Sequence, residues 1–387
     1  MSATVDTIDG LDAPDAPDAP DVPDAPEAID EGLLELQGSS VATLRPAQRH
    51  RKVRGLTRDE TIEYVVAFAV GIHLSGLLRF VLDWDDLMGS GLVALLAFVG
   101  SHYLIVRERS SPEVAIDKTV TTIMWTVGLA VVALLVWMVT FVALKGAAKL
   151  RPSFLTSDLR TVSALDEGGG AYHAIVGTLM QVGLATVAVI PVSILTAVYL
   201  HEIRGRMAGL IRFIVDALSG LPSIVAGLLI ITIFPGYAGV KASMALGILA
   251  IPIVTRGAEE VLRTVPDGLR ESSLALGAPQ WRVVLRVVLP TAQAGLVTVT
   301  LLAVARMIGE TAPVILTAFG ATATNYNVLS NPQASLSFFV YDLIRVPDQV
   351  SNDRAWAGAL LLLLIVMIVF VAARVALARS ERRLGKR

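Results

Sequence analysis

Long apolar runs dominate this chain and limit what it can fold into. Of its 387 residues, 54% are hydrophobic and only 17% are charged, and the mean hydropathy is +0.65. This composition excludes a water-soluble globular domain and predicts an all-α integral membrane protein, a polytopic helical bundle. Eight runs approach or exceed the roughly 20 residues that a membrane-spanning helix needs: 61–82, 87–106, 120–144, 174–200, 211–234, 240–255, 291–319 and 355–377. The sixth run is short, which favours a helix inside the bundle or beside a re-entrant turn.

The amino-terminal part has a different composition. Residues 1–37 contain eleven acidic and no basic residues, with Asp-Ala-Pro triplets repeating from Asp12 to Pro26. Such a segment buries too little apolar surface to offset its ordering entropy, so we expect a disordered acidic tail, with partner binding as the alternative. The six Lys and Arg residues of 45–58 predict a basic juxtamembrane segment attracted to anionic membrane lipid. The expected domains are 1–57 as tail and juxtamembrane segment, 58–110 as a transmembrane hairpin, and 111–387 as the main transmembrane domain.

Basic residues predict the orientation in the membrane, because Lys and Arg are enriched in cytoplasmic loops. With a cytoplasmic amino terminus, the outer segments 145–160, 241 and 345–354 contain 7 basic residues. The inner segments then contain 23 basic residues: 45–58, 107–118, 204–212, 256–286 and 374–387. The sequence therefore predicts a multi-pass membrane protein with both termini in the cytoplasm. The long polar segments 145–173 and 320–354 lie outside, either as plain connectors or as a docking rim for an external binding protein.

Several classes of function lack their usual signatures. The chain has no cysteine, and its five histidines lack the spacing of metal ligands, so neither a metal nor a cofactor is expected. No phosphate-binding loop of the Gly-x-x-x-x-Gly-Lys-Ser/Thr type is present. No paired nucleophile and base or Asp/His cluster points to an intramembrane enzyme, and nothing points to nucleic acid. The chain is therefore not expected to be an enzyme, and any ATP hydrolysis is expected of a separate partner.

The polar loop between the sixth and seventh runs carries a spaced pattern. Glu271-Ser272-Ser273 is followed by Gly277, Val287 and Leu289-Pro290. This resembles the cytoplasmic "EAA" loop of ABC-importer permeases, in which Glu-Ala-Ala, Gly, Ile and Leu-Pro have the same spacing. Only the two serines and the valine depart from the pattern. The resemblance implies a membrane transport subunit with a type I ABC-importer core of six spans, here with two extra amino-terminal spans. It also implies a coupling loop within 256–290.

The loop also favours a short surface helix. Pro266 suits a helix start, Gly277 followed by Pro279 suits its end, and residues 267–276 lie between them. Leu269, Ser272, Ser273 and Leu276 would share one side, where small serines permit close approach to an ATPase groove. Glu271 would pair with a basic residue of that partner, and Gly277 would let the chain turn back into the next span. The ATPase-coupling residues predicted here are Leu269, Glu271, Ser272, Ser273, Leu276 and Gly277.

The seventh run contains two ionisable residues that a lipid-facing helix would avoid. Arg306 and Glu310 are four residues apart and can pair on one helical face, and each costs roughly 2.5–3.5 kcal/mol at a helix centre. We therefore expect both to face protein or water near mid-membrane. A guanidinium there offers fixed positive charge and several donors for a tetrahedral oxyanion. Gly309 would allow close approach, and a purely structural ion pair is the alternative.

The same run sharpens the resemblance. The segment Arg306-Met-Ile-Gly-Glu-Thr-Ala-Pro313 is similar to the PstA-type permease family of the phosphate-specific ABC importer. Supporting stretches include Tyr199–Glu202, 220–228 and 259–278, and the resemblance covers about 115–387. It implies phosphate import across a prokaryotic plasma membrane, with Arg306, Gly309, Glu310 and Thr311 on the substrate path. It also implies three partners: a PstC-like permease, a cytoplasmic ABC ATPase dimer that uses ATP, and an external phosphate-binding protein. The alternatives are transport of another oxyanion, such as sulfate or molybdate, and a non-transporting membrane scaffold.

Overall fold

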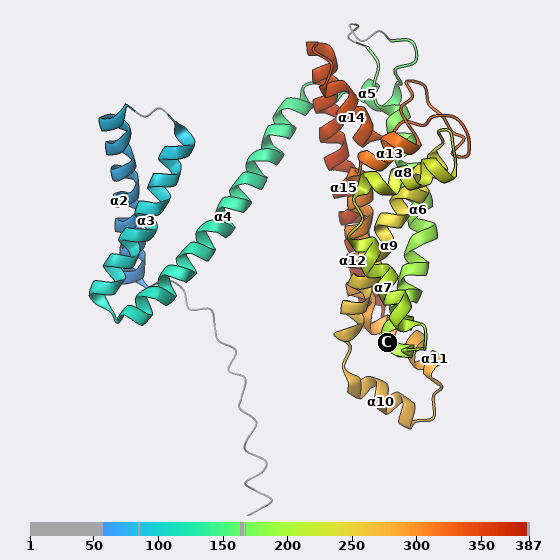
Figure 1. The fold of residues 1–387 in the computed structure, drawn as a ribbon, viewed down its shortest axis with the longest axis horizontal. Helices are drawn as coiled ribbons and strands as arrows, with labels where there is room; N and C mark the ends of the chain where they lie inside the picture. Colours follow the sequence, from blue (N-terminus) through green and yellow to red (C-terminus); the bar gives the residue numbers. More distant parts are fainter. Residues whose placement is uncertain (1–56, 84–85, 163–165, 167, 385–387) are drawn as a thin grey trace, which may run out of the picture. The chain divides into compact units, whose positions relative to one another are not determined.

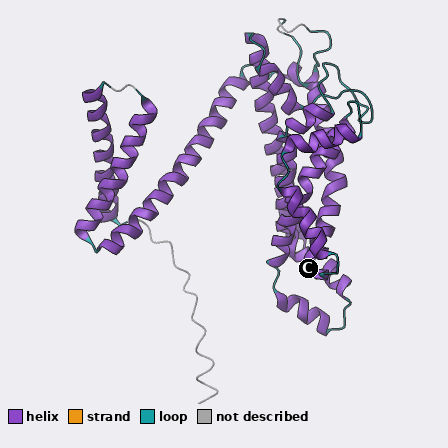
Figure 2. Cartoon of the chain, in the orientation of Figure 1, coloured by secondary structure: helices purple, strands orange, loops and turns teal. Residues whose placement is uncertain are grey.

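A computed structural model describes residues 57–83, 86–162, 166 and 168–384. The predicted acidic tail, and the basic segment up to residue 56, lie outside the described residues. The described chain forms two compact units, 1–123 and 124–387, whose boundary falls inside one long helix. Its regular elements are all helices, and the described part contains no strand (Figure 2).

The first unit holds helices α2 (Arg58–Leu82) and α3 (Leu87–Arg109) and the start of α4 (Pro112–Ala147). A capping box starts α2, because the Thr57 side chain accepts from the Glu60 backbone and the Glu60 side chain accepts from the Thr57 backbone. The two helices approach closely at Gly71, where a Cβ would lie 2.6 Å from the Ala94 carbonyl oxygen. The unit is thus a tightly packed helical hairpin followed by a third helix.

The second unit begins within α4 and contains the remaining elements (Figure 1). In chain order these are α5 (Pro152–Thr156), α6 (Tyr172–Val198), the π-helix η1 (Tyr199–Ile203), α7 (Ala208–Ser219), α8 (Ser223–Ile233), α9 (Gly239–Arg263), α10 (Asp267–Ala275), α11 (Gln280–Val283), the π-helix η2 (Val284–Val288), α12 (Leu289–Gly309), α13 (Ala312–Thr317), α14 (Leu336–Ile344) and α15 (Gln349–Leu384).

The predicted fold class is confirmed. Over the described residues, seven helices are long and apolar enough to cross a membrane, and α7 and α8 add an eighth if the bent pair counts as one span. The sequence predicts continuous helix over 211–234, but the structure bends by 107° between α7 and α8. Pro222 lies at this bend and supplies no backbone N–H, and it disfavours helical geometry at Leu221.

Helix α9 is the central span of the second unit. It is longer than its apolar run of 240–255, because the polar residues up to Arg263 remain helical. In its apolar stretch 61% of the residues are buried, against 0% in α4. Reciprocal close contacts join it to α12: a Cβ on Gly257 would lie 2.6 Å from Val299, and one on Gly295 would lie 2.5 Å from Val261. Small residues therefore allow the close helix packing that stabilises membrane bundles.

Candidate functional site

The polar loop folds as the sequence predicts, with a short helix, α10, over Asp267–Ala275. Pro266 is the residue before its first turn, with an extended backbone (φ −59°, ψ 135°), and Asp267 places a negative charge near the helix amino terminus. Leu276 follows the helix, and Gly277 has φ +81°. This left-handed conformation is one that glycine adopts without steric cost, so the glycine reverses the chain here.

The outer surface of α10 is available to a partner. None of its nine residues is buried. Leu269 is 41% exposed, Leu274 48% and Leu276 89%. This end of the bundle therefore presents an uncovered helix with apolar side chains, at the place where the coupling residues are predicted.

The polar coupling residues are placed on the same helix. The Ser272 and Ser273 hydroxyls donate to the Leu269 carbonyl, at 3.3 and 2.7 Å, so both side chains fold back against their own helix. Glu271 is exposed, and no salt bridge links it to another described residue. Its predicted pairing with a partner's basic residue stays a prediction.

The side chain of Arg270 attaches α10 to the bundle. The Arg270 guanidinium donates to the Glu202 carboxylate at 2.9 Å and to the carbonyls of Leu262 and Val265 at 2.7 and 2.6 Å. It also donates to Asp267 at 2.8 Å. The Gln280 side chain donates to the Glu202 carbonyl at 2.7 Å, so η1 holds both ends of the loop. The position of α10 therefore depends on η1 and on the end of α9.

The Arg270–Glu202 pair is nearly buried, with side-chain exposures of 13% and 9%. Breaking such a pair leaves an uncompensated charge and typically costs about 3–5 kcal/mol. The sequence predicts neither residue as an attachment point: Glu202 is named only as the end of a stretch similar to the permease family, and Arg270 is not named. The available signal was the arginine directly before Glu271, the first residue of the spaced pattern, but its partner lies 68 residues earlier and only the folded bundle brings them together.

The predicted substrate-path residues lie at the carboxyl end of α12, away from the loop that contains α10. Arg306 Nε is 3.3 Å from Glu310 Oε1, so the expected pair forms. Continuous helix over 291–319 is wrong, because α12 ends at Gly309, Glu310 is extended (φ −71°, ψ 126°) and α13 starts at Ala312. Pro313 explains the break, since its ring would clash with the Gly309 carbonyl four residues earlier and it has no N–H to donate.

This break changes the surroundings of the two charges. The Arg306 side chain is 59% exposed, whereas Glu310 is 16% exposed and its carbonyl accepts a hydrogen bond from Ser337 at 2.9 Å. A Cβ on Gly309 would meet nothing within 4 Å, and Thr311 lies in the break. The arginine thus projects beside open space, anchored by a carboxylate whose backbone is held in place.

The two predicted outer segments come together. The Leu159 amide donates to the Thr322 carbonyl at 3.0 Å, and Asp158 accepts from the Thr324 amide and hydroxyl, each at 3.3 Å. Burial raises the pKa of Asp158, but hydrogen bonds from the Arg160 and Thr324 backbones and the Thr324 hydroxyl outweigh it and lower the pKa below its ordinary value. These hydrogen bonds therefore hold residues 158–159 of one segment against residues 322–324 of the other; docking of a binding protein there stays a prediction.

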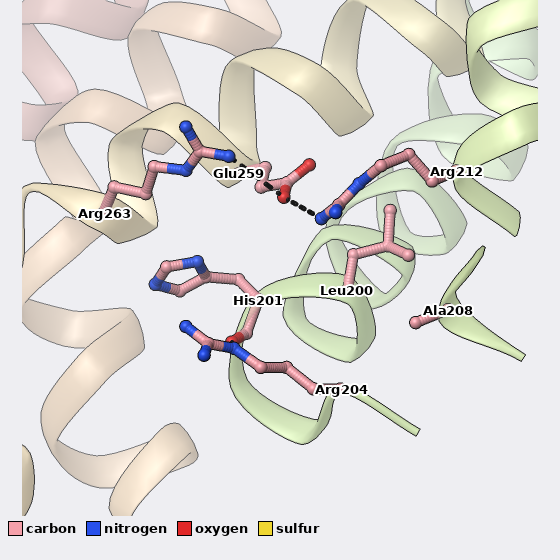
Figure 3. A pocket seen from close by; sticks show the side chains of 7 residues that line it. All are labelled: Leu200, His201, Arg204, Ala208, Arg212, Glu259 and Arg263. Carbon is pink, nitrogen blue, oxygen red and sulfur yellow. Dashed lines mark hydrogen bonds and ion pairs between the residues drawn. The ribbon is translucent and has the colours of Figure 1, made fainter. Parts of the chain in front are cut away.

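A basic pocket lies beside the attachment of α10 (Figure 3). Arg212 of α7 and Arg263 of α9 approach Glu259 from two sides, at 2.5 and 3.5 Å. His201 and Arg204 line the same pocket, and Arg204 Nε donates to the His201 carbonyl at 3.1 Å. The sequence analysis counted these arginines only as topology signals.

Comparison with known proteins defines the class. The family described as "Binding-protein-dependent transport system inner membrane component" matches residues 189–386. The chain is therefore the membrane component of such a transport system, and not its ATPase.

Comparison with individual relatives identifies the family within this class. The chain is 38% identical over 274 residues to phosphate transport system permease protein PstA 1 of Mycobacterium tuberculosis, which covers 69% of this chain and 90% of that protein. It is 37% identical over 257 residues to PstA of Mycobacterium leprae (65% and 84%) and 37% identical over 223 residues to PstA of Pasteurella multocida (56% and 79%). The chain belongs to the PstA family of phosphate transport system permease proteins.

A solved structure of the MetNI methionine ABC transporter, facing inward, is also similar. Its TM-score is 0.41 at 21% sequence identity, over 54% of this chain and 94% of that one.

Proposed function

We propose that this chain is the transmembrane permease subunit of an ATP-driven inorganic phosphate importer. It forms half of the translocation path and pairs with a PstC-like permease, a cytoplasmic ABC ATPase dimer and an external phosphate-binding protein. Both termini and α10 are cytoplasmic in this proposal. The named phosphate permeases to which the chain is 37–38% identical support the substrate.

The coupling role is supported mainly by the exposed surface of helix α10. None of its residues is fully buried, and the nearly buried side chain of Arg270 fixes it to η1 and α9. A helix held this firmly moves with the bundle, so force from an ATPase docked on it would reach the spans instead of being lost in a flexible loop.

Arg306 supports the role in the substrate path. Its side chain is 59% exposed beside the break between α12 and α13, and a partner permease would close the open side. Fixed guanidinium donors suit the several oxygens of phosphate.

Uptake of labelled phosphate tests the proposal. The gene would be expressed with its co-purifying subunits in cells lacking their own high-affinity phosphate uptake, with sulfate and molybdate as competitors. We expect phosphate uptake that excess unlabelled phosphate abolishes and the other oxyanions leave intact. Stronger competition by sulfate or molybdate would assign another oxyanion, and absence of both uptake and a co-purifying ATPase would support a scaffold.

A further inference from the structure

The basic pocket beside α10 has no role in the function proposed above. It is a cavity of about 500 Å³ between η1, α7 and α9, lined by Leu200, His201, Arg204, Ala208, Arg212, Glu259 and Arg263. Ligand-binding pockets in proteins commonly have volumes of roughly 300–1,000 Å³. The cavity is therefore large enough for a small anionic group together with water or part of a larger molecule.

Positive charge exceeds negative charge in the lining. Three arginines face one carboxylate, Glu259, which pairs with Arg212 and Arg263. Arg263 also lies 3.6 Å from the exposed Glu260. No carboxylate among the described residues lies within ion-pair distance of Arg204, whose Nε donates to a backbone carbonyl. The terminal guanidinium nitrogens of Arg204 thus contribute charge that no described acidic side chain neutralises.

The arginines come from three separate elements. Arg204 follows η1 with a left-handed backbone (φ 51°, ψ 41°), Arg212 lies on α7, and Arg263 is the last residue of α9. Guanidinium groups make paired, charge-assisted hydrogen bonds to phosphate oxygens and are the preferred phosphate ligands where geometry matters. Guanidiniums that line one cavity from separate elements therefore fit one phosphate group better than a row of surface charges would.

The pocket lies where both phospholipid headgroups and dissolved phosphate can reach it. It lies at the ends of two candidate spans, Tyr172–Ile203 and Gly239–Arg263, so it is near the boundary between membrane and water. Basic pockets between spans at this depth bind phospholipid headgroups, and dissolved phosphate also has access. We infer that the cavity lined by Arg204, Arg212 and Arg263 is a binding site for a phosphate group, supplied by an anionic phospholipid or by free phosphate.

Such a ligand would lie next to the coupling helix. A second cavity of about 410 Å³ shares His201, Arg204 and Arg263 with the first, and Asp267, Arg270 and Leu274 of α10 also line it. A phosphate group bound to Arg204 would therefore tie η1 to the elements that hold α10. The inference does not depend on which ion the protein transports.

Binding to the full-length chain in nanodiscs tests the site. Equilibrium dialysis in phosphatidylcholine discs would use labelled inorganic phosphate, and native mass spectrometry of mixed discs would count retained phosphatidylglycerol. The variant is Arg204→Gln, because Arg204 is exposed and breaks no described ion pair when changed. The matched control is Arg206→Gln, an exposed arginine two residues away that lines neither cavity.

We expect the wild-type chain to bind at least one probe saturably and Arg204→Gln to weaken it roughly tenfold, the usual effect of losing a charged hydrogen bond. Arg206→Gln should stay within about twofold. A loss confined to inorganic phosphate assigns dissolved phosphate, and a loss of phosphatidylglycerol assigns the lipid. The inference is overturned if the wild-type chain binds neither probe, if Arg204→Gln binds like wild type, or if both variants weaken binding equally.

Discussion

At the residue scale, two arginines with the same charge have opposite surroundings. Arg270 is 13% exposed and hydrogen-bonded on several sides, whereas Arg306 is 59% exposed and has one carboxylate near it. A buried pair is costly to break, but an exposed pair contributes only about 0–1 kcal/mol. We therefore expect substitutions of Arg270 to affect the fold around α10, and substitutions of Arg306 to affect transport alone.

Replacing Arg270 by Met should detach α10, because Glu202 then keeps a nearly buried charge without its partner. We expect the free energy of unfolding to fall by about 3–5 kcal/mol, together with loss of ATPase association. Thermal unfolding of the purified chain and co-purification of the ATPase would measure both effects. Arg282→Met, at an exposed position, is the control and should change stability by less than about 0.5 kcal/mol.

A double variant separates the ion pair from general damage to the loop. Arg270→Met combined with Glu202→Leu removes both charges, so much of the lost stability should return. If the double variant is no more stable than Arg270→Met alone, the pair does not account for the attachment of α10.

Replacing Arg306 by Gln should leave assembly intact and reduce phosphate uptake more than about tenfold, because a charged hydrogen bond contributes about 1.5–3 kcal/mol. Arg306→Lys keeps the charge without the guanidinium fork and should retain part of the uptake. Uptake by cells and recovery of the intact complex are the two measurements.

The charge-swapped variant, Arg306→Glu with Glu310→Arg, tests the alternative of a purely structural pair. Assembly without uptake is expected, because a carboxylate at position 306 repels phosphate. Full recovery of uptake by the swap would show that only the pairing matters and would remove Arg306 from the anion path.

At the scale of single elements, α10 combines a firm attachment with a free surface. Its end depends on Gly277, whose φ of +81° disfavours any residue with a Cβ, although no described atom outside Gly277 and its two chain neighbours lies within 4 Å of the Cβ position. Gly268 lies in the same helix with equally open space and no positive φ. Substitution of both glycines by alanine therefore isolates the effect of backbone strain, because neither position is sterically blocked.

We expect Gly277→Ala to cost about 1–2 kcal/mol, because the left-handed backbone brings its Cβ close to the following carbonyl oxygen. Phosphate-stimulated ATP hydrolysis should fall, since the end of α10 is displaced. Gly268→Ala should be neutral or stabilise the helix by up to about 1 kcal/mol. Equal ATPase activity in wild type and Gly277→Ala would count against a coupling role for this turn.

The sequence predicted those elements that depend on local signals. Apolar runs located the spans, and Pro266 and Gly277 delimited α10 to within about one residue. Hydropathy carries no information on chain direction, so the bend at Pro222 and the break at Glu310 were missed although both adjoin a proline. The Arg270–Glu202 pair joins residues far apart in the chain. The periodicity of a sequence does not indicate which distant charges will be in contact after folding.

At the scale of the second unit, α9 connects α10 at one end of the unit with the segment 320–335 at the other. At one end the carbonyl of Leu262 accepts from Arg270 of α10. At the other, Val240 and Ser243 bond to the segment 320–335 and to α6, through the Val328 and Gln181 carbonyls. Figure 1 places α10 and α13 at opposite ends of this unit, with α9 and α12 running between them. We therefore expect a force applied at α10 to reach the outer segments through α9.

This arrangement can couple ATP hydrolysis to transport only if the two ends of the unit face opposite sides of the membrane. The excess of basic residues on one side predicts this topology. The chain has no cysteine, so a single introduced thiol reports its own location. Ser153 in α5 and Ser272 in α10 are both exposed and lie in the two oppositely assigned loops. In intact cells, an impermeant maleimide should label Ser153→Cys and leave Ser272→Cys unlabelled. After permeabilisation both should react, which shows that each thiol is accessible. Labelling of Ser272→Cys alone in intact cells would invert the topology and place α10 out of reach of any cytoplasmic ATPase.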